Sequence, residues 1–370
     1  MSPKRIDVHH HLLTPEYIKE LAKVGVVEAG GVPLGQLERW KPEDSLAVMD
    51  RYGIETALLS VSSPGLCFGD AAKAREMARS LNEFAAGCAR RLPGRFGFFA
   101  VLPLPDVKAA LSEIGYALDT LGAAGVGLLS NHEGVYLGDP RFEEVFAELD
   151  RRAAVAFVHP TVFTGSEIPS AHNAGSPVTT IQSSVLEFVF DTTRAVANLI
   201  SSGTLKRYPN VRIVLSHAGG AVPLFADRLI DRSEIMALVQ EAQAGRAAPP
   251  SPETLEKMLR AATEDAFELL RGLYYDTALS ANPTVLAALQ RLVPASHVFF
   301  GTDYPFAQEI GVRYSLNGLA AYQGFGEAER AMIESGTALA LGYRRGPGEL
   351  ESPAVSGRVA RHGERSTNET

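Results

Sequence analysis

The sequence predicts a (β/α)8 TIM barrel, an α/β fold, with insertions after the first and sixth strands. Three observations indicate this fold: eight short apolar runs of β-forming residues, amphipathic helical stretches between them, and polar residues at the ends of most runs. Apolar runs without alternation are typical of parallel strands that are buried on both faces. Strands that alternate with helices form βα units, and eight such units close a barrel.

The eight expected strands are spaced along most of the chain. They comprise residues 5–8, 56–61, 95–102, 125–129, 155–158, 211–215, 273–275 and 297–300. The clearest helical stretches lie between them and comprise residues 45–52, 71–91, 106–124, 142–152, 185–207 and 283–292. Asn82 and Gly87 lie inside the stretch at 71–91, and their low helix propensity weakens its continuity.

Two connections are longer than a bare barrel requires. Residues 12–44 follow the first strand and contain the only tryptophan, and residues 218–272 follow the sixth strand. Long connections in compact domains commonly form lids, binding loops or assembly elements. We expect residues 1–345 to form one barrel domain and the Gly-, Ser- and Glu-rich residues 346–370 to form a disordered tail.

The composition is that of an ordinary globular protein. Of the 370 residues, 46% are hydrophobic and 21% are charged, which excludes a largely disordered chain. The formal net charge of −8 argues against nucleic acid or an anionic membrane as the main partner. Two cysteines make no disulfide framework, and no apolar run is long enough for a signal peptide or a membrane span. We therefore expect a cytoplasmic protein.

The strand ends carry the residues that could bind a metal ion. His9 and His11 are two apart on the first strand, so both imidazoles face the same side, whereas His10 faces the opposite side. His159 ends the fifth strand and Asp303 follows the eighth, and such ends converge on one face of a barrel. Three neutral imidazoles and one carboxylate suit Zn²⁺, and also Mn²⁺ or Fe²⁺, with one position left for water or substrate.

His217, at the end of the sixth strand, leaves two possibilities open. It is either a ligand of a second metal ion or an acid/base group beside a single ion. Residues 125–132 contain no lysine that could bridge two metals, so we favour one metal ion with His217 hydrogen-bonded to its bound water or to a substrate oxygen. Asp303 is interpreted as a metal ligand and proton shuttle, with a helix-capping aspartate as the alternative. Asp276 is expected to be a hydrogen-bonding partner or cap.

Several motifs resemble the amidohydrolase superfamily, in its metal-dependent decarboxylase branch. The segments that carry the resemblance are IDVHHH (6–11), FVHP (157–160), LSHAGG (215–220) and GTDYPF (301–306). The similarity covers about residues 4–345. Within the branch it is strongest to the 6-methylsalicylate decarboxylase group, through the motifs at residues 8–11, 60–65, 94–100 and 191–195.

The resemblance implies roles for individual residues. His9, His11, His159 and Asp303 would hold one divalent metal ion, Zn²⁺ in the first place and Mn²⁺ as the alternative, with His217 beside its open position. Arg228 matches a family arginine that reaches into the neighbouring subunit's site, which implies a homodimer; the alternative is a surface arginine. Ala47 stands where aminocarboxymuconate-semialdehyde decarboxylases have a carboxylate-binding arginine, so that substrate is not expected.

These features together predict a non-oxidative decarboxylase, a carbon–carbon lyase, of a hydroxybenzoate-type acid such as 6-methylsalicylate. Asp303 would donate the proton that replaces CO₂, and His217 would tune the proton balance. An apolar pocket should hold the ring, with Trp40, Phe68, Phe163, Phe190 and Phe306 as candidate contacts and the core as the alternative place for each. A metal-dependent hydrolase of a lactone, ester or amide is the second interpretation, and a non-catalytic metal-binding protein is the third.

Overall fold

Eight parallel strands, paired in chain order, form the centre of the molecule. The computed structural model describes residues 4–66, 68–161, 182 and 184–343. Its strands are β1 (Arg5–His11), β4 (Ile54–Ser60), β5 (Phe96–Val101), β6 (Gly125–Leu129), β9 (Val155–His159), β10 (Arg212–Leu215), β11 (Tyr274–Asp276) and β12 (Val298–Phe299). Each corresponds to one expected strand, and the end of β1 lies three residues beyond the expected one.

The two ends of the sheet meet and nearly close the barrel. The backbone N–H of Val8 donates to the carbonyl oxygen of Phe300 at 3.1 Å, and that of His11 donates to Tyr304 at 2.7 Å. Apolar side chains of the strands fill the interior, among them Ile6, Val8, Leu58, Phe99, Phe157 and Val214. The predicted TIM-barrel fold is therefore confirmed.

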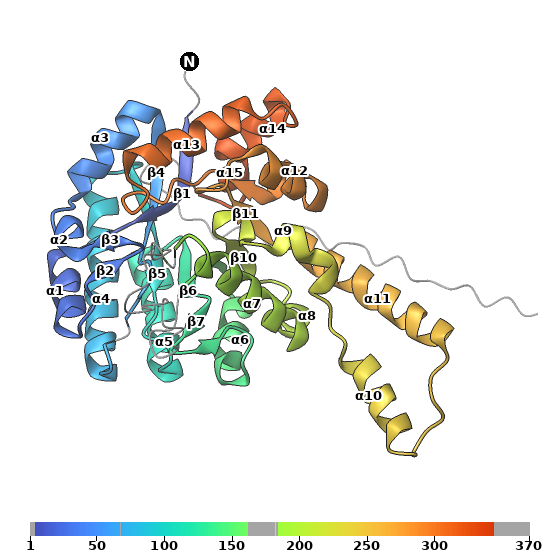
Figure 1. Ribbon diagram of the computed structural model, residues 1–370. Coiled ribbons are helices and arrows are strands. Elements are labelled where there is room, and N and C mark those ends of the chain that lie inside the picture. The colour runs from blue at the N-terminus through green and yellow to red at the C-terminus, as the bar shows by residue number, and fades with distance from the viewer. Residues whose placement is uncertain (1–3, 67, 162–181, 183, 344–370) are drawn as a thin grey trace, which may run out of the picture.

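Helices surround the barrel (Figure 1). In the first half of the chain they are α1 (Pro15–Lys23), α2 (Leu34–Leu37), α3 (Pro42–Tyr52), α4 (Ala71–Arg91), α5 (Val107–Tyr116), the π-helical η1 (Ala117–Leu121), η2 (Pro140–Phe142) and α6 (Glu143–Arg151). In the second half they are α7 (Glu187–Ser201), α8 (Thr204–Arg207), η3 (His217–Gly219), α9 (Val222–Phe225), η4 (Ala226–Arg228), α10 (Ser233–Gln243), α11 (Pro252–Arg271), α12 (Pro283–Leu292), η5 (Ala295–His297), α13 (Gln308–Ala321), α14 (Glu327–Ala331), η6 (Met332–Gly336) and α15 (Thr337–Ala340). Two short antiparallel strand pairs lie outside the barrel sheet. They are β2 (Glu28–Ala29) with β3 (Val32–Pro33), and β7 (Asn131–His132) with β8 (Val135–Tyr136).

The helix expected at residues 71–91 is present and unbroken, although Asn82 and Gly87 lie inside it. Helix α4 runs from Ala71 to Arg91 without interruption. The Asn82 amide is buried and exchanges two hydrogen bonds with the backbone of Val101, each 2.9 Å long. These bonds satisfy the amide inside the fold, so they outweigh the weak helix propensity of asparagine.

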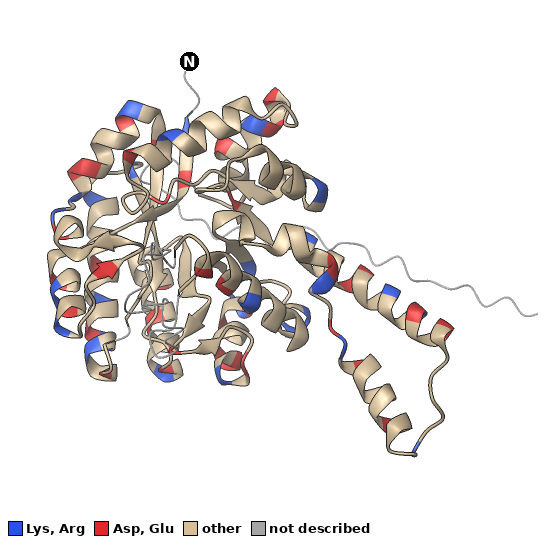
Figure 2. Ribbon diagram, in the orientation of Figure 1, with Lys and Arg blue, Asp and Glu red and all other residues tan. Residues whose placement is uncertain are grey.

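Helices α10 and α11 extend away from the barrel as an antiparallel pair (Figure 1). Helix α10 has no buried residue, and α11 buries only Ala266 and Leu270. Charged residues of both signs are spread over the outer helices, including this pair, while the strands carry few (Figure 2). Within the described ranges, none of the helices has the length and apolarity needed to span a bilayer. The predicted tail at 346–370 lies outside the described residues.

The first strand contains an irregularity that decides which way its histidines face. The pairing of β1 with β4 shifts between Asp7 and His10, so that three steps along β1 match two steps along β4. Such a bulge reverses the alternation of side chains beyond it. Ile6 and Val8 pack inside the barrel, and His9 also touches the interior, with its ring centroid 5.1 Å from that of Phe157. The site histidines therefore face inward.

Candidate metal centre

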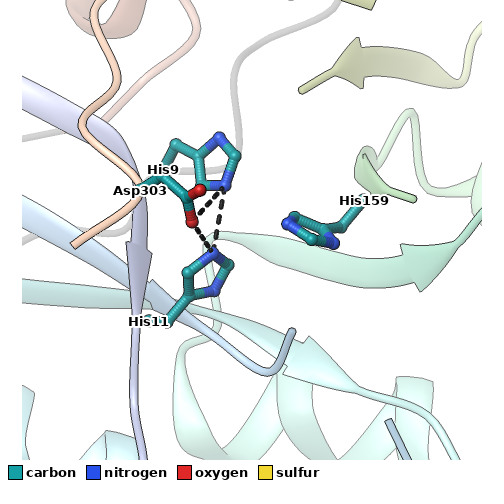
Figure 3. A group of neighbouring side chains, drawn as sticks. All are labelled: His9, His11, His159 and Asp303. Atoms are coloured by element: carbon teal, nitrogen blue, oxygen red, sulfur yellow. Dashed lines mark hydrogen bonds and ion pairs between the residues drawn. The ribbon is translucent and has the colours of Figure 1, made fainter. Parts of the chain in front are cut away.

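Four side chains from distant parts of the chain meet at the carboxyl end of the barrel. His9 and His11 lie on β1, His159 ends β9, and Asp303 follows β12. Each offers one ligand atom, and the four atoms lie within 4.8 Å of one another. Figure 3 shows the two β1 histidines beside the carboxylate of Asp303, with the His159 ring facing them. These are the four residues that the sequence analysis selected as metal ligands.

The spacing of the ligand atoms fits a metal ion. Nε2 of His9 lies 3.0 Å from Nε2 of His11. Oδ1 of Asp303 lies 3.4 Å from the first of these nitrogens and 3.0 Å from the second. Ligand atoms bound at about 2.0–2.1 Å to a tetrahedral Zn²⁺ stand roughly 3.3 Å apart. The three separations among His9, His11 and Asp303 are close to this value, and the ligand atom of His159 lies within 4.8 Å of the others.

The outer ring nitrogen of each of the three histidines has a hydrogen-bond acceptor. Nδ1 of His9 donates to Oδ2 of Asp276 at 2.7 Å. Nδ1 of His159 donates to the backbone carbonyl oxygen of Pro160 at 2.7 Å. Nδ1 of His11 faces the carbonyl and hydroxyl oxygens of Ser60 at 3.3 Å and 3.0 Å. These acceptors select the tautomer that places a lone pair on Nε2. Three lone pairs therefore converge with one carboxylate, and this donor set fits a divalent cation.

The charges around the site favour a positive charge at its centre. Burial by itself lowers the pKa of His9, but the carboxylates of Asp276 and Asp303 raise it to about 10, so a bound cation would take the place of a proton on Nε2. Burial lowers the pKa of His11, and burial with the neighbouring imidazoles holds that of His159 well below 6.5. Burial opposes ionisation of Asp303, yet the surrounding histidines hold its pKa well below its usual range. Asp303 is therefore a carboxylate at neutral pH.

Asp276 orients two histidines of the site without joining the group of four. One carboxylate oxygen accepts the hydrogen bond from His9, and the other accepts the backbone N–H of His217 at 2.9 Å. The side chain is completely buried. This position agrees with the predicted role of a hydrogen-bonding partner.

His217 lies beside the four candidate ligands, at the wall of a cavity. Its Nε2 is 3.4 Å from Oδ2 of Asp303, and its ring centroid is 4.7 Å from that of His9 and 5.2 Å from that of His159. The ring is partly exposed, which the candidate ligands His9 and His11 are not. His217 can therefore reach a molecule bound in the cavity.

The backbone is strained at this end of the barrel. Asp303, His217 and Ala218 have left-handed φ angles of 61°, 51° and 58°. Such conformations cost of the order of 1–3 kcal/mol each in non-glycine residues and cluster at functional sites. A Cβ atom at Gly301 would lie 2.8 Å from Cβ of His9, so a glycine is needed for the end of β12 to approach β1.

A cavity of 290 Å³ opens onto two of the candidate ligands, His159 and Asp303. Its described lining is largely apolar, with three hydroxyl groups; these residues are Val185, Phe188, Val189, Leu279 and Phe306, and Ser62, Ser184 and Ser280. None of the described lining residues is Lys or Arg. The volume and lining suit a single aromatic ring.

The structure places the predicted aromatic contacts in different surroundings. Phe306 lines the cavity, with its ring centroid 5.2 Å from that of His11. Trp40 is buried in the core, where its Nε1 donates to Oγ of Ser45 at 3.1 Å. Phe68 is also buried in the core, near Tyr17. Neither of these two lines the cavity, and Phe163 lies outside the described residues.

Phe190 does not line the cavity, because it lies on the outer face of α7. It is 51% exposed, whereas Phe188 is buried and its ring lies 5.8 Å from that of His159. Two residues along a helix correspond to about 200° of rotation, so the two rings face opposite sides. The buried positions of α7, which include Thr192, Ala195 and Leu199, share the phase of Phe188. That periodicity is the sequence signal that could have selected Phe188.

Arg228 lies on η4 and is exposed. Its guanidinium carbon is 6.0 Å from the ring centroid of Phe225. It is absent from the described lining of its own chain's cavity. The sequence-based expectation assigns it to the site of a neighbouring subunit.

The chain is similar to known proteins over nearly its whole length. The amidohydrolase family model matches residues 6–341. The 6-methylsalicylic acid decarboxylase of Penicillium expansum is 36% identical over 342 residues, which cover 91% of this chain and 95% of that protein.

Solved structures share the fold. A crystal structure of an amidohydrolase II superimposes with a TM-score of 0.77 at 25% identity, covering 91% of this chain and 99% of the other. A dihydroxybenzoic acid decarboxylase from Polaromonas sp. JS666, solved with bound manganese, superimposes with a TM-score of 0.71 at 22% identity, covering 92% of this chain and 96% of the other. The chain therefore belongs to the amidohydrolase family, in the group that includes the 6-methylsalicylic acid decarboxylases.

Proposed function

We propose that the protein is a metal-dependent non-oxidative decarboxylase of a hydroxybenzoate-type acid such as 6-methylsalicylate. The observation that carries the proposal is the convergence of three imidazole lone pairs and one carboxylate at a largely apolar cavity of 290 Å³. Relatives named decarboxylases support the reaction class, since one that covers nearly the whole chain is a 6-methylsalicylic acid decarboxylase.

His9, His11, His159 and Asp303 would hold one divalent ion. Zn²⁺ is the first choice because three imidazoles and one carboxylate match its preferred ligands, and Mn²⁺ is the alternative because the related dihydroxybenzoic acid decarboxylase was solved with manganese. When bound, the ion supplies a Lewis acid that draws electron density from the substrate's oxygens.

Asp303 is the proposed carrier of the proton. Because its pKa is held well below the usual range, it rests as a carboxylate and must accept a proton before it can donate one. We assign it the proton of the ring hydroxyl group ortho to the substrate carboxylate. It returns this proton to the ring carbon that bears the carboxylate, the carbon–carbon bond breaks, and its electron pair restores the aromatic ring as CO₂ leaves. The phenolate then takes a proton from water.

His217 is placed to assist this transfer. Its Nε2 lies 3.4 Å from Oδ2 of Asp303, so it can stabilise the carboxylate when the proton has left. The same ring reaches the cavity, where it can donate a hydrogen bond to an oxygen of the substrate. In this proposal His217 controls the protonation of Asp303.

Further features of the proposal concern partners and location. Arg228 would reach the pocket of a second subunit in a homodimer and bind the substrate there, since its own chain's cavity has no Lys or Arg in the described lining. The negative net charge argues against nucleic acid or an anionic membrane as the partner. We place the enzyme in the cytoplasm.

The proposal is tested by incubating the metal-loaded protein with 6-methylsalicylate, with γ-resorcylate and with a simple lactone. Release of CO₂ from an aromatic acid supports the decarboxylase. Opening of the lactone without release of CO₂ favours the metal-dependent hydrolase, in which Asp303 would act as the base toward water. Absence of any reaction contradicts both.

A further inference from the structure

Asp191 lies at the centre of a polar cluster that neither the metal site nor the proposed chemistry uses. It is on α7, one turn beyond Phe188 of the cavity wall. Its carboxylate accepts hydrogen bonds from the hydroxyl of Ser130, from Nδ2 of Asn131 at 3.2 Å and from the hydroxyl of Tyr136 at 2.5 Å. Ser130 directly follows β6, Asn131 lies on β7 and Tyr136 lies on β8. One carboxylate therefore ties α7 to the segment that follows the fourth barrel strand.

The same donors also hold the chain just beyond His159. The hydroxyl of Ser130 accepts the backbone N–H of Thr161 at 3.0 Å, and Nδ2 of Asn131 donates to the carbonyl oxygen of Thr161 at 3.0 Å. Both backbone groups of Thr161 are thus fixed two residues after a candidate ligand. Through Ser130 and Asn131, Asp191 is connected to the end of β9.

The opposite side of α7 is docked on the turn that contains His217. The carbonyl oxygen of Val189 would lie 2.2 Å from a Cβ atom at Gly220, so the two backbones are in close contact. The hydroxyl of Thr193 donates to Val189 at 2.8 Å and accepts the backbone N–H of Ala221 at 3.0 Å. The first half of α7 is therefore held from both sides, at Asp191 on one side and at Val189 and Thr193 on the other.

The second half of α7 has independent support. It buries Ala195, Val196, Leu199 and Ile200, and Nδ2 of Asn198 donates to the carbonyl oxygen of Leu137 at 2.7 Å. Apolar burial stabilises this half without Asp191. Removing the charge of Asp191 should consequently loosen the cavity wall while the helix itself stays folded.

We propose that Asp191 is a positioning residue, whose carboxylate fixes the Phe188–Val189 wall of the cavity relative to the end of β9 that carries His159. Asp191 does not touch the substrate and acts on substrate binding through the position of Phe188. Its kinetic consequences rest on the proposed function, since they are measured on the decarboxylation.

The test is a double-mutant cycle of Asp191→Asn with Phe188→Ala. An asparagine oxygen is uncharged and has fewer lone pairs than the three donors need, so we expect the KM for the aromatic acid to rise about tenfold in D191N. The kcat should stay within about threefold and the metal content should be unchanged, because the ligands are intact. In the F188A background, D191N should raise KM by less than about twofold, since the wall it positions is gone.

Tyr136→Phe and Asp265→Asn complete the design. Y136F removes one of three donors and should raise KM by a smaller factor, and it should add nothing to D191N. D265N is the matched control, because it neutralises an aspartate whose ion pair with Lys206 lies on the surface, with both side chains more than half exposed. It should leave KM unchanged.

Hydrogen exchange gives a readout that does not depend on activity. In D191N, amides of residues 155–161 and 187–193 should exchange faster than in the wild type and in D265N, while those of α4 should not. Unchanged exchange in these segments overturns the inference even if the protein proves not to be a decarboxylase. An unchanged KM, or an equal effect of D191N with and without Phe188, also overturns it.

Discussion

Asp276 and His9 are joined by a 2.7 Å hydrogen bond from Nδ1 to Oδ2, between two side chains that are completely buried. The second oxygen of Asp276 accepts the backbone N–H of His217, so one carboxylate orients both a candidate ligand and the neighbouring acid/base histidine. Carboxylate partners of this kind orient histidine ligands and raise their basicity.

Asp276→Asn should therefore weaken metal binding by about 10- to 100-fold. The amide offers His9 a weaker acceptor, and its NH₂ group cannot accept the backbone N–H of His217. Competition with a chelator of known zinc affinity measures the effect, and D265N serves as the surface control. Wild-type affinity in D276N would mean that this hydrogen bond does not support the ligand.

Asp303→Asn separates the proton carrier from the metal ligand. The amide oxygen can still bind the ion, so some metal should remain, but it cannot carry a proton, and we expect kcat to fall by at least about 100-fold. Turnover and metal content are measured on the same preparation. Near-normal turnover per bound ion would remove Asp303 as the proton carrier.

His11→Ala should reduce the metal content, because it removes one of four ligands. His10→Ala is its matched contrast on the same strand. Nδ1 of His10 is hydrogen-bonded to Oδ2 of Asp7 at 2.9 Å, and its Nε2 is hydrogen-bonded to Oγ of Ser45 at 2.8 Å. Both bonds lie on the side away from the cavity. H10A should lower the melting temperature but keep the metal. Elemental analysis decides, and equal stoichiometry in H11A and wild type would place the metal elsewhere.

His132 should make folding sensitive to acid. It is buried, within the described chain its Nε2 has no hydrogen-bond partner, and burial lowers its pKa to about 3. Between pH 3 and the unfolded value of about 6.5, the unfolded state binds more protons, so the stability due to this residue is complete above pH 6.5 and is lost as pH falls toward 3. The loss can reach about 4 kcal/mol.

The acid sensitivity is measured by urea unfolding from pH 8 to pH 4 with saturating metal. His132→Leu removes the proton-binding group, so its free energy of unfolding should fall less steeply below pH 6.5 than that of the wild type. Parallel pH profiles for the two proteins would assign the acid sensitivity to other groups.

Arg228→Ala tests whether subunits share sites. If the arginine serves the neighbouring pocket, R228A should lose activity by about tenfold or more. Mixing R228A with D303N should then restore part of the activity, because one site of the mixed dimer would combine an intact Asp303 with an intact Arg228. A fully active R228A protein, or one that is monomeric and active, would contradict a shared site.

Much of the fold and of the metal site was predictable from local patterns. Continuous apolar runs and the helices between them indicated eight βα units, and chain order alone then brought the ends of β1, β9 and β12 to one face. His9, His11, His159 and Asp303 could be selected because residue type and strand-end position are both visible in the sequence. The orientation of Phe188 and Phe190 was also present in the sequence, in the periodicity of the buried positions of α7.

The sequence by itself thus determined the strand count, the order of the strands and the four candidate ligands, because these follow from short-range periodicity and from the common direction of parallel strands. The tertiary structure decided the rest. The bulge in β1 sets the direction of His9 and His11, the buried carboxylate of Asp276 sets the orientation of the His9 ring, and Asp191 gathers donors some 55 to 61 residues away along the chain. Each of these depends on contacts between distant segments, and such contacts leave no periodic trace in the sequence.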